Sequence, residues 1–76
     1  MIKVVFFAVC KDYFGKELTL EVASTNQLKE ELLKIAPQSK SLMDSCKFVL
    51  ENTVLHKNIS LENGQIIMVL PPSSGG

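Results

Sequence analysis

Apolar positions predict a strand at each end of the chain. Residues 2–9 (IKVVFFAV) and 65–70 (QIIMVL) are apolar on both faces toward their ends, which predicts two interior strands covered on both sides. Residues 17–22 (ELTLEV) alternate strictly between polar and apolar, which predicts a strand with one buried face. Residues 46–52 alternate as well, and the mixed residues 54–61 predict a weak edge strand.

One segment carries a clear helix pattern. Ser24, followed three residues later by Gln27, is typical of a capping box at a helix N-terminus. Pro37 predicts that the helix ends at the preceding residue. Between these signals, apolar residues at helical spacing form one stripe that we expect to face the core: Leu28, Leu32 and Ile35.

The order of elements predicts the fold class. Residues 11–16 indicate a helical turn ended by Gly15, and residues 38–45 a loop or one short helical turn. The order is β-β-α-β-(β)-β, with the first and last strands adjacent and parallel through a right-handed crossover. We therefore expect an α+β protein: a single β-grasp domain over residues 1–70, with a mixed sheet and one main helix on one face. A flexible tail, residues 71–76, follows.

Composition limits the classes of partner. The 76 residues suffice for one small domain, and the 8 basic residues, all lysine, balance 8 acidic ones. No basic excess favours nucleic acid, and no apolar run is long enough for a bilayer, so neither partner is expected. With two cysteines and no secretory signal pattern, we expect a reducing, cytoplasmic location.

Three residues are weighed as candidates for chemistry. Cys10 and Cys46 lie at strand ends without a CxxC motif, so small buried apolar roles are favoured over a persulfide or thioester role. His56 is the only histidine and has no ligand partners at metal-binding spacing, which indicates a surface residue and no metal site.

The last residues carry the most specific pattern. Pro71 and Pro72 cannot continue a strand ladder, so the chain must leave the sheet there. The six residues 71–76 reach about 20 Å when extended. Ser73, Ser74, Gly75 and Gly76 have little bulk and could enter a narrow active site of a partner. Activated by ATP, the Gly76 carboxyl would become an acyl donor, so the tail is suited to be a substrate. The alternative is an inert, floppy end.

The chain resembles a known family at both ends. "MIKVVFFAVCKDYFG" and "IIMVLPPSSGG" are similar to the small subunit of molybdopterin synthase. That family consists of ubiquitin-like sulfur carriers related to the thiamin sulfur carrier. The resemblance implies that an activating enzyme adenylates Gly76 with ATP and that sulfur then converts it to a thiocarboxylate. It carries over to Pro71, Pro72, Gly75 and Gly76.

The resemblance also implies the partners. The tail would enter the active site of the molybdopterin synthase large subunit and pass sulfur to a pterin precursor, in a complex with two copies of each subunit. A ubiquitin-activating-like adenylyltransferase and a sulfur-donor enzyme are the other implied partners. The chain itself would be a non-catalytic subunit of a sulfurtransferase and would bind no cofactor, since the activating enzyme uses the ATP.

Three residues are expected to contact partners. The strand assignment directs Phe7 or Phe6 away from the helix, with Phe7 favoured, and Leu70 with it. By resemblance, Lys11 joins them. The chain departs from the family at two of these places: Val69-Leu70 replaces aromatic residues before the prolines, and Lys11-Asp12 replaces Arg-Glu. Both departures bear on partner contacts rather than on tail chemistry.

Other functions fit the same pattern. A sulfur carrier for thiamin, cysteine or RNA thiolation would share the fold and the terminal glycines. A ubiquitin-like protein modifier would join Gly76 to a lysine by an amide bond. The remaining alternative is an interaction domain whose tail has no chemical role.

Overall fold

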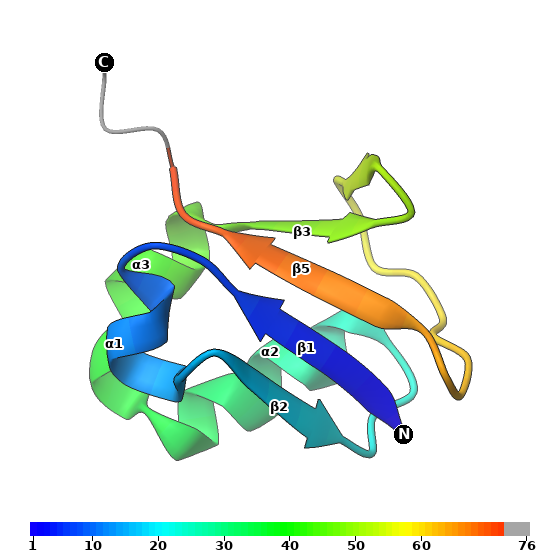
Figure 1. Cartoon of the computed structure of the whole chain (residues 1–76), viewed down its shortest axis with the longest axis horizontal. Helices are drawn as coiled ribbons and strands as arrows, with labels where there is room; N and C mark the ends of the chain where they lie inside the picture. The colour runs from blue at the N-terminus through cyan, green and yellow to red at the C-terminus, as the bar shows by residue number, and fades with distance from the viewer. Residues whose placement is uncertain (73–76) are drawn as a thin grey trace.

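The computed structural model describes residues 1–72, which form one mixed sheet with helices on one side (Figure 1). The strand order is β2-β1-β5-β3-β4. β1 and β5 are parallel, and the other neighbouring pairs are antiparallel. The strands are β1 (Ile2–Phe6), β2 (Glu17–Leu20), β3 (Lys47–Leu50), β4 (Thr53–Leu55) and β5 (Ile66–Leu70). The expected β-grasp arrangement, with first and last strands adjacent and parallel, is confirmed.

The helical segments lie behind the sheet and beside one end of it (Figure 1). They are α1 (Cys10–Phe14), α2 (Thr25–Ile35), the 3-10 helix η1 (Pro37–Ser39) and α3 (Lys40–Ser45). α1 is the expected helical turn, and Gly15, at φ 80°, ends it by donating its N–H to the Lys11 carbonyl. η1 and α3 together are longer than the loop or single turn expected there.

The capping signal of α2 is confirmed. The Gln27 N–H donates to Ser24 Oγ at 3.2 Å. In return, Gln27 Oε1 accepts from the N–H of Ala23 at 2.7 Å, one residue before the cap. α2 ends at Ile35, and after Ala36 a new helical turn, η1, begins at Pro37, a first helical position that proline tolerates.

The core lies between α2 and the sheet. Phe6 and Phe14 stack with their ring centroids 4.7 Å apart, which packs α1 against β1. Large side chains that are almost completely buried come from β1, α2 and β5: Ile2, Val4, Phe6, Leu28, Leu32, Ile67 and Val69.

An ion pair links α2 to α3. The Asp44 carboxylate contacts Lys29 Nζ at 2.9 Å and Lys40 Nζ at 3.1 Å. These hydrogen bonds, the one to Lys29 first, hold the pKa of Asp44 below its usual value. Because Asp44 lies at the surface, we expect the link to position α3 more than to stabilise the fold.

Two sequence expectations about element ends are wrong. The first strand ends at Phe6, not at Val9, because Ala8 adopts a left-handed φ of 52° that breaks the strand. Ile35 is half exposed instead of core-facing. At Ala36 the backbone leaves helical geometry (φ −137°, ψ 79°), so the chain turns inward and Ala36 is buried in its place.

Candidate functional site

The described part of the chain ends where β5 leaves the sheet. β5 lies between β1 and β3, and its last residue, Leu70, pairs with Lys47 of β3. Pro71 is half-buried and Pro72 is exposed. Since proline has no N–H to donate, the ladder cannot extend past Leu70 on this strand. The predicted tail residues Ser73, Ser74, Gly75 and Gly76 lie outside the described residues.

An apolar row crosses the sheet on the face opposite α2. The strand register places Val5 of β1, Met68 of β5, Val49 of β3 and Val54 of β4 beside one another in that order. Because side chains of paired residues point to the same side, the row runs across four neighbouring strands without a polar interruption. Val5 and Met68 are half-buried and Val54 is exposed, whereas Val49, in the middle of the row, is buried.

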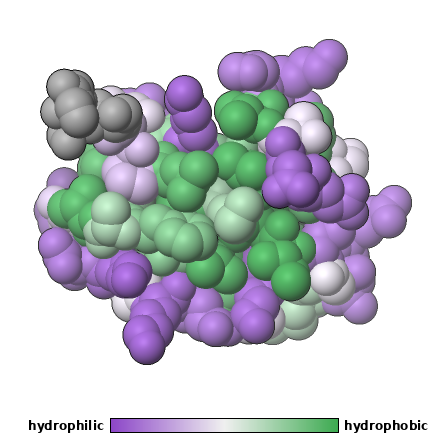
Figure 2. Space-filling model, turned by 45° about the horizontal axis from the view of Figure 1, so that its top comes forward, coloured by the Kyte–Doolittle hydropathy of each residue, from purple (hydrophilic) through white to green (hydrophobic). Residues whose placement is uncertain are grey.

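The row widens into a continuous patch. Ile66 and Leu70 lie on the same face of β5 as Met68, two positions away on either side. Ile66 is 51% exposed and Phe7, just after β1, is 37% exposed. Figure 2 shows the apolar band bordered by polar side chains. We call this surface the open sheet face: Val5, Phe7, Val49, Val54, Ile66, Met68 and Leu70.

The open sheet face corrects one expectation. The first and last strands were expected to be covered on both sides, because both of their faces are apolar. Among residues 1–72 the helices cover only one side of the sheet (Figure 1). An apolar surface of this kind, next to the point where the tail leaves, is typical of a docking site for another protein.

The predicted contact residues are placed as follows. Phe7 is exposed, whereas Phe6 is fully buried, which confirms that Phe7 is the accessible one of the pair. Leu70 is half-buried on the open sheet face. Lys11 is exposed on α1. That these residues bind partners stays a prediction.

Most of the open sheet face was missed from the sequence. Val5, Val49, Val54, Ile66 and Met68 were all assigned to strands, but none was singled out. A signal existed: the strands have two apolar faces, yet the sequence pattern predicts one long helix, and residues 1–72 contain one, which can cover only one of these faces.

The two cysteines are brought together, which their spacing did not indicate. The thiols of Cys10 and Cys46 are free, and their sulfur atoms are 3.5 Å apart. Burial, and then the neighbouring Cys10 thiol, raise the pKa of Cys46 to about 12. A thiol with this pKa is protonated at neutral pH, so it is a poor nucleophile.

Other chemistry is sparse in the described residues. Within residues 1–72, no group of three His, Cys, Asp or Glu side chains could hold a metal ion. His56 is exposed in the segment after β4, as expected. No helix in this part of the chain is long and apolar enough to cross a membrane. The candidate site therefore consists of the open sheet face and the point beside it where the chain leaves β5.

Comparison with known proteins rests on structure. No protein-family model and no curated protein sequence matches the chain. Two similar structures are small archaeal modifier protein 1 from Methanosarcina acetivorans and from Haloferax volcanii. The first has a TM-score of 0.84 and 21% identity over 99% of this chain and 95% of that one. The second has a TM-score of 0.81 and 17% identity over 99% and 98%.

A third similar structure is part of a complex. It is a chain in the complex of subunits 1 and 2 of molybdopterin-converting factor from Helicobacter pylori. Its TM-score is 0.73, with 22% identity over 99% of this chain and 97% of that one. At these identities the likeness concerns the fold alone: this chain has the ubiquitin-like β-grasp fold.

Proposed function

We propose that this protein is a ubiquitin-like sulfur carrier, the small subunit of a molybdopterin synthase. The observation that carries the proposal is the position of Leu70 and Pro71. They end the central strand at the border of the open sheet face, and the sequence continues from there to Gly75 and Gly76. A partner docked on that face would have the last residues within reach of its active site.

The chemistry resides at the carboxyl group of Gly76. Its oxygen attacks the α-phosphorus of ATP on an activating enzyme, pyrophosphate leaves, and an acyl-adenylate forms. A hydrosulfide sulfur then attacks the carbonyl carbon and AMP leaves, so that a C–S bond replaces a C–O bond. In the synthase, the large subunit would supply the catalytic groups, and the thiocarboxylate would give its sulfur to the pterin precursor.

In this proposal the chain holds its C-terminal tail in position for a partner enzyme, and the catalytic groups belong to that partner. The rigid strand β5 fixes where the tail begins, and the two prolines direct it away from the sheet. Glycine at the end leaves the carbonyl carbon open to attack, because it has no side chain. The Helicobacter pylori complex of similar fold supports a second subunit as the docked partner.

Intact-mass spectrometry of the protein from its native cell tests the proposal. A fraction heavier by one oxygen-to-sulfur exchange, mapped by fragmentation to Gly76, is expected. The cells are harvested with and without brief acid treatment, because a thiocarboxylate hydrolyses. Absence of this fraction from protein harvested without acid treatment would contradict the proposal.

A protein-modifier function is the second candidate. It is favoured by the two archaeal modifier proteins, whose structures have the higher TM-scores. In that case an amine of a target lysine, rather than sulfur, attacks the activated Gly76. Peptide mapping separates the two functions: the last site for trypsin is Lys57, so a modifier leaves residues 58–76 as a branch on lysines of other proteins, and a sulfur carrier leaves none.

A further inference from the structure

A pocket lies at the end of the sheet farthest from the tail. It has a volume of about 540 Å³ and is bordered by residues 49–52, by residues 62–66 and by Met68. Val49, Ile66 and Met68 also belong to the open sheet face. The pocket therefore continues the open sheet face beyond the Ile66 end of β5, whereas the tail leaves at the Leu70 end.

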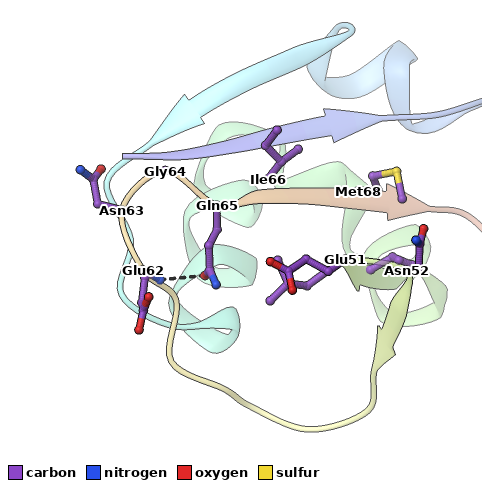
Figure 3. Close-up of a pocket in the computed structure, with 10 residues that line it drawn as sticks. Glu51, Asn52, Glu62, Asn63, Gly64, Gln65, Ile66 and Met68 are labelled. Atoms are coloured by element: carbon purple, nitrogen blue, oxygen red, sulfur yellow. Dashed lines mark hydrogen bonds between the residues drawn. The ribbon is translucent and has the colours of Figure 1, made fainter.

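The walls of the pocket are held in place by local bonds. Gln65 Oε1 accepts from the Glu62 N–H at 2.8 Å, as drawn in Figure 3, and the Gly64 N–H donates to the Met1 carbonyl at 2.9 Å. The amino group of Met1 donates to Asn63 Oδ1. One wall is thus tied to the start of β1, so it does not have to form when a ligand binds.

The other wall is a tight turn that bears a carboxylate. Glu51 and Asn52 join β3 to β4 with φ values of 50° and 64°, as a type I′ turn requires. Glycine, asparagine or aspartate fit such positions best, so a glutamate there is conformationally unfavourable. In Figure 3 the Glu51 side chain points toward the Gln65 side of the pocket.

Charge differs between the two ends of the open sheet face. Glu51 and Glu62 border the pocket, and neither forms an ion pair within residues 1–72. At the tail end, Lys47 lies beside Leu70 and also has no ion pair in that part of the chain. Lys3 lies beside Ile66 at the pocket end, but it is paired with Glu17 at 3.3 Å. A partner on this face therefore meets net negative charge at the pocket and positive charge near the tail.

We infer that the pocket receives an arginine side chain of the protein that docks on the open sheet face. The apolar floor of Val49, Ile66 and Met68 suits the aliphatic stem, and the Glu51 carboxylate suits the guanidinium, which is weakly hydrated and binds carboxylates well. With the pocket filled, the partner has one orientation, with its active site toward the tail. The identity of this docked partner rests on the proposed function; the binding of arginine does not.

Titration of the full 15N-labelled chain tests the inference. The probe is N-acetyl-arginine methylamide, and its control is the citrulline analogue, which has the same shape without the charge. We expect the arginine probe to shift the amide signals of Glu51, Gln65 and Ile66, and the citrulline probe to shift them much less. Equal shifts with both probes, or shifts confined to other residues, would overturn the inference.

Two variants with the same change in charge distinguish binding in the pocket from an effect of the net charge of the protein. Glu51→Gln should weaken arginine binding by roughly threefold, as for a partly exposed ion pair. Glu30→Gln removes the same charge from an exposed site on α2 and should leave binding unchanged. Equal weakening by the two variants would mean that only net charge matters and would refute the pocket.

A further variant, Glu51→Asn, separates arginine binding from the stability of the turn. Because asparagine suits a left-handed turn position better, this variant should melt at the same or a higher temperature, while it weakens arginine binding by about the same factor as Glu51→Gln. If it binds arginine as well as the parent chain, Glu51 is not the ligand. These readouts involve no Gly76 chemistry. A missing thiocarboxylate therefore refutes only the sulfur-carrier function, and a failed titration refutes only the pocket.

Discussion

At the scale of single residues, backbone strain lies where the chain changes direction beside the open sheet face. Ala8, Glu51 and Asn52 are the non-glycine residues within positions 1–72 that have positive φ. For L-residues this region costs about 1–2 kcal/mol per residue, because Cβ approaches the following carbonyl oxygen. Ala8 allows the chain to turn from β1 into α1, just after Phe7.

Ala8→Gly should therefore stabilise the protein by up to about 1 kcal/mol, since glycine adopts a φ of 52° without steric conflict. The matched control is Val9→Gly, at φ −63°, where glycine gives only greater freedom to the unfolded chain and should destabilise. Urea denaturation of both variants measures the difference. A lower stability for Ala8→Gly than for the parent chain would contradict the strain argument.

The thiol of Cys46 gives a pH prediction. Because its pKa is raised to about 12, the thiol should react slowly with iodoacetamide at pH 8 in the folded protein. The folded state holds the proton more tightly than the unfolded state does. The resulting stability is present below the usual thiol pKa of 9.0 and is lost as pH rises toward 12.

Alkylation followed by mass spectrometry across alkaline pH checks this prediction. The rate at Cys46 should rise about tenfold for each pH unit, as the thiolate fraction does. Protein unfolded in urea, where the thiol has its ordinary pKa, provides the reference rate. Equal folded and unfolded rates at pH 8 would show that the thiol is not protected.

At the scale of elements, α2 provides most of the cover for the sheet. Leu28 and Leu32 are completely buried, while Ile35, one turn further, is half exposed. The helix therefore contributes to stability through its first two turns and not through its end. Two apolar side chains on the same helix, similar in size and different in burial, allow a direct comparison.

Leu32→Ala should destabilise the protein by about 3 kcal/mol, because it removes apolar contact and leaves a cavity. Ile35→Ala should change the free energy of unfolding by less than about 1 kcal/mol, since half of the side chain already contacts water. Chemical denaturation measures both. If the two losses were similar, the stripe predicted from the sequence would describe the packing better than the structure does.

The types of most elements and both ends of α2 could be predicted from the sequence, whereas the end of β1 and the exposure of Ile35 could not. Alternation marked β2, and the Ser24–Gln27 cap marked the start of α2, because both are local signals. The end of β1 depends on the backbone of Ala8, and alanine carries no preference for a left-handed conformation. The exposure of Ile35 depends on how Ala36 packs, which is a tertiary effect.

At the scale of the whole molecule, the open sheet face lies beside the point where the chain leaves β5. The register that aligns Val5, Met68 and Val49 could not be read from the sequence, because strand pairing had to be known first. The proximity of Cys10 and Cys46 was hidden for the same reason. The position of the tail exit could be predicted, since Pro71 marks it directly.

Removal of Gly75 and Gly76 should leave the melting temperature nearly unchanged and abolish adenylation of the chain. The reason is that the last buried core residue is Val69, whereas the proposed chemistry needs the carboxyl of Gly76; the new carboxyl on Ser74 is two residues short of that position. Thermal melting and a pyrophosphate-exchange assay with the activating enzyme measure the two effects. A large drop in melting temperature would mean that the tail packs against the domain.

A substitution on the open sheet face is the matched control for the truncation. Phe7→Ser should keep the fold, because Phe7 is partly exposed, and should weaken docking by about tenfold or more if this aromatic side chain anchors a partner. Its Gly76 remains available for chemistry. Loss of the fold in Phe7→Ser would assign the side chain to the core instead.

The parallel pairing of β1 and β5 has a mechanical consequence. Met1 precedes β1 at one end of the sheet, and Pro71 follows β5 at the other end. When the two chain ends are pulled apart, β1 slides along β5 and all the hydrogen bonds between them are loaded together. The antiparallel β3–β4 hairpin, pulled at its open end, instead separates one bond at a time. Optical tweezers should find a much higher rupture force in the first geometry, so a motor that drags this protein by its tail would meet its strongest resistance at the first step.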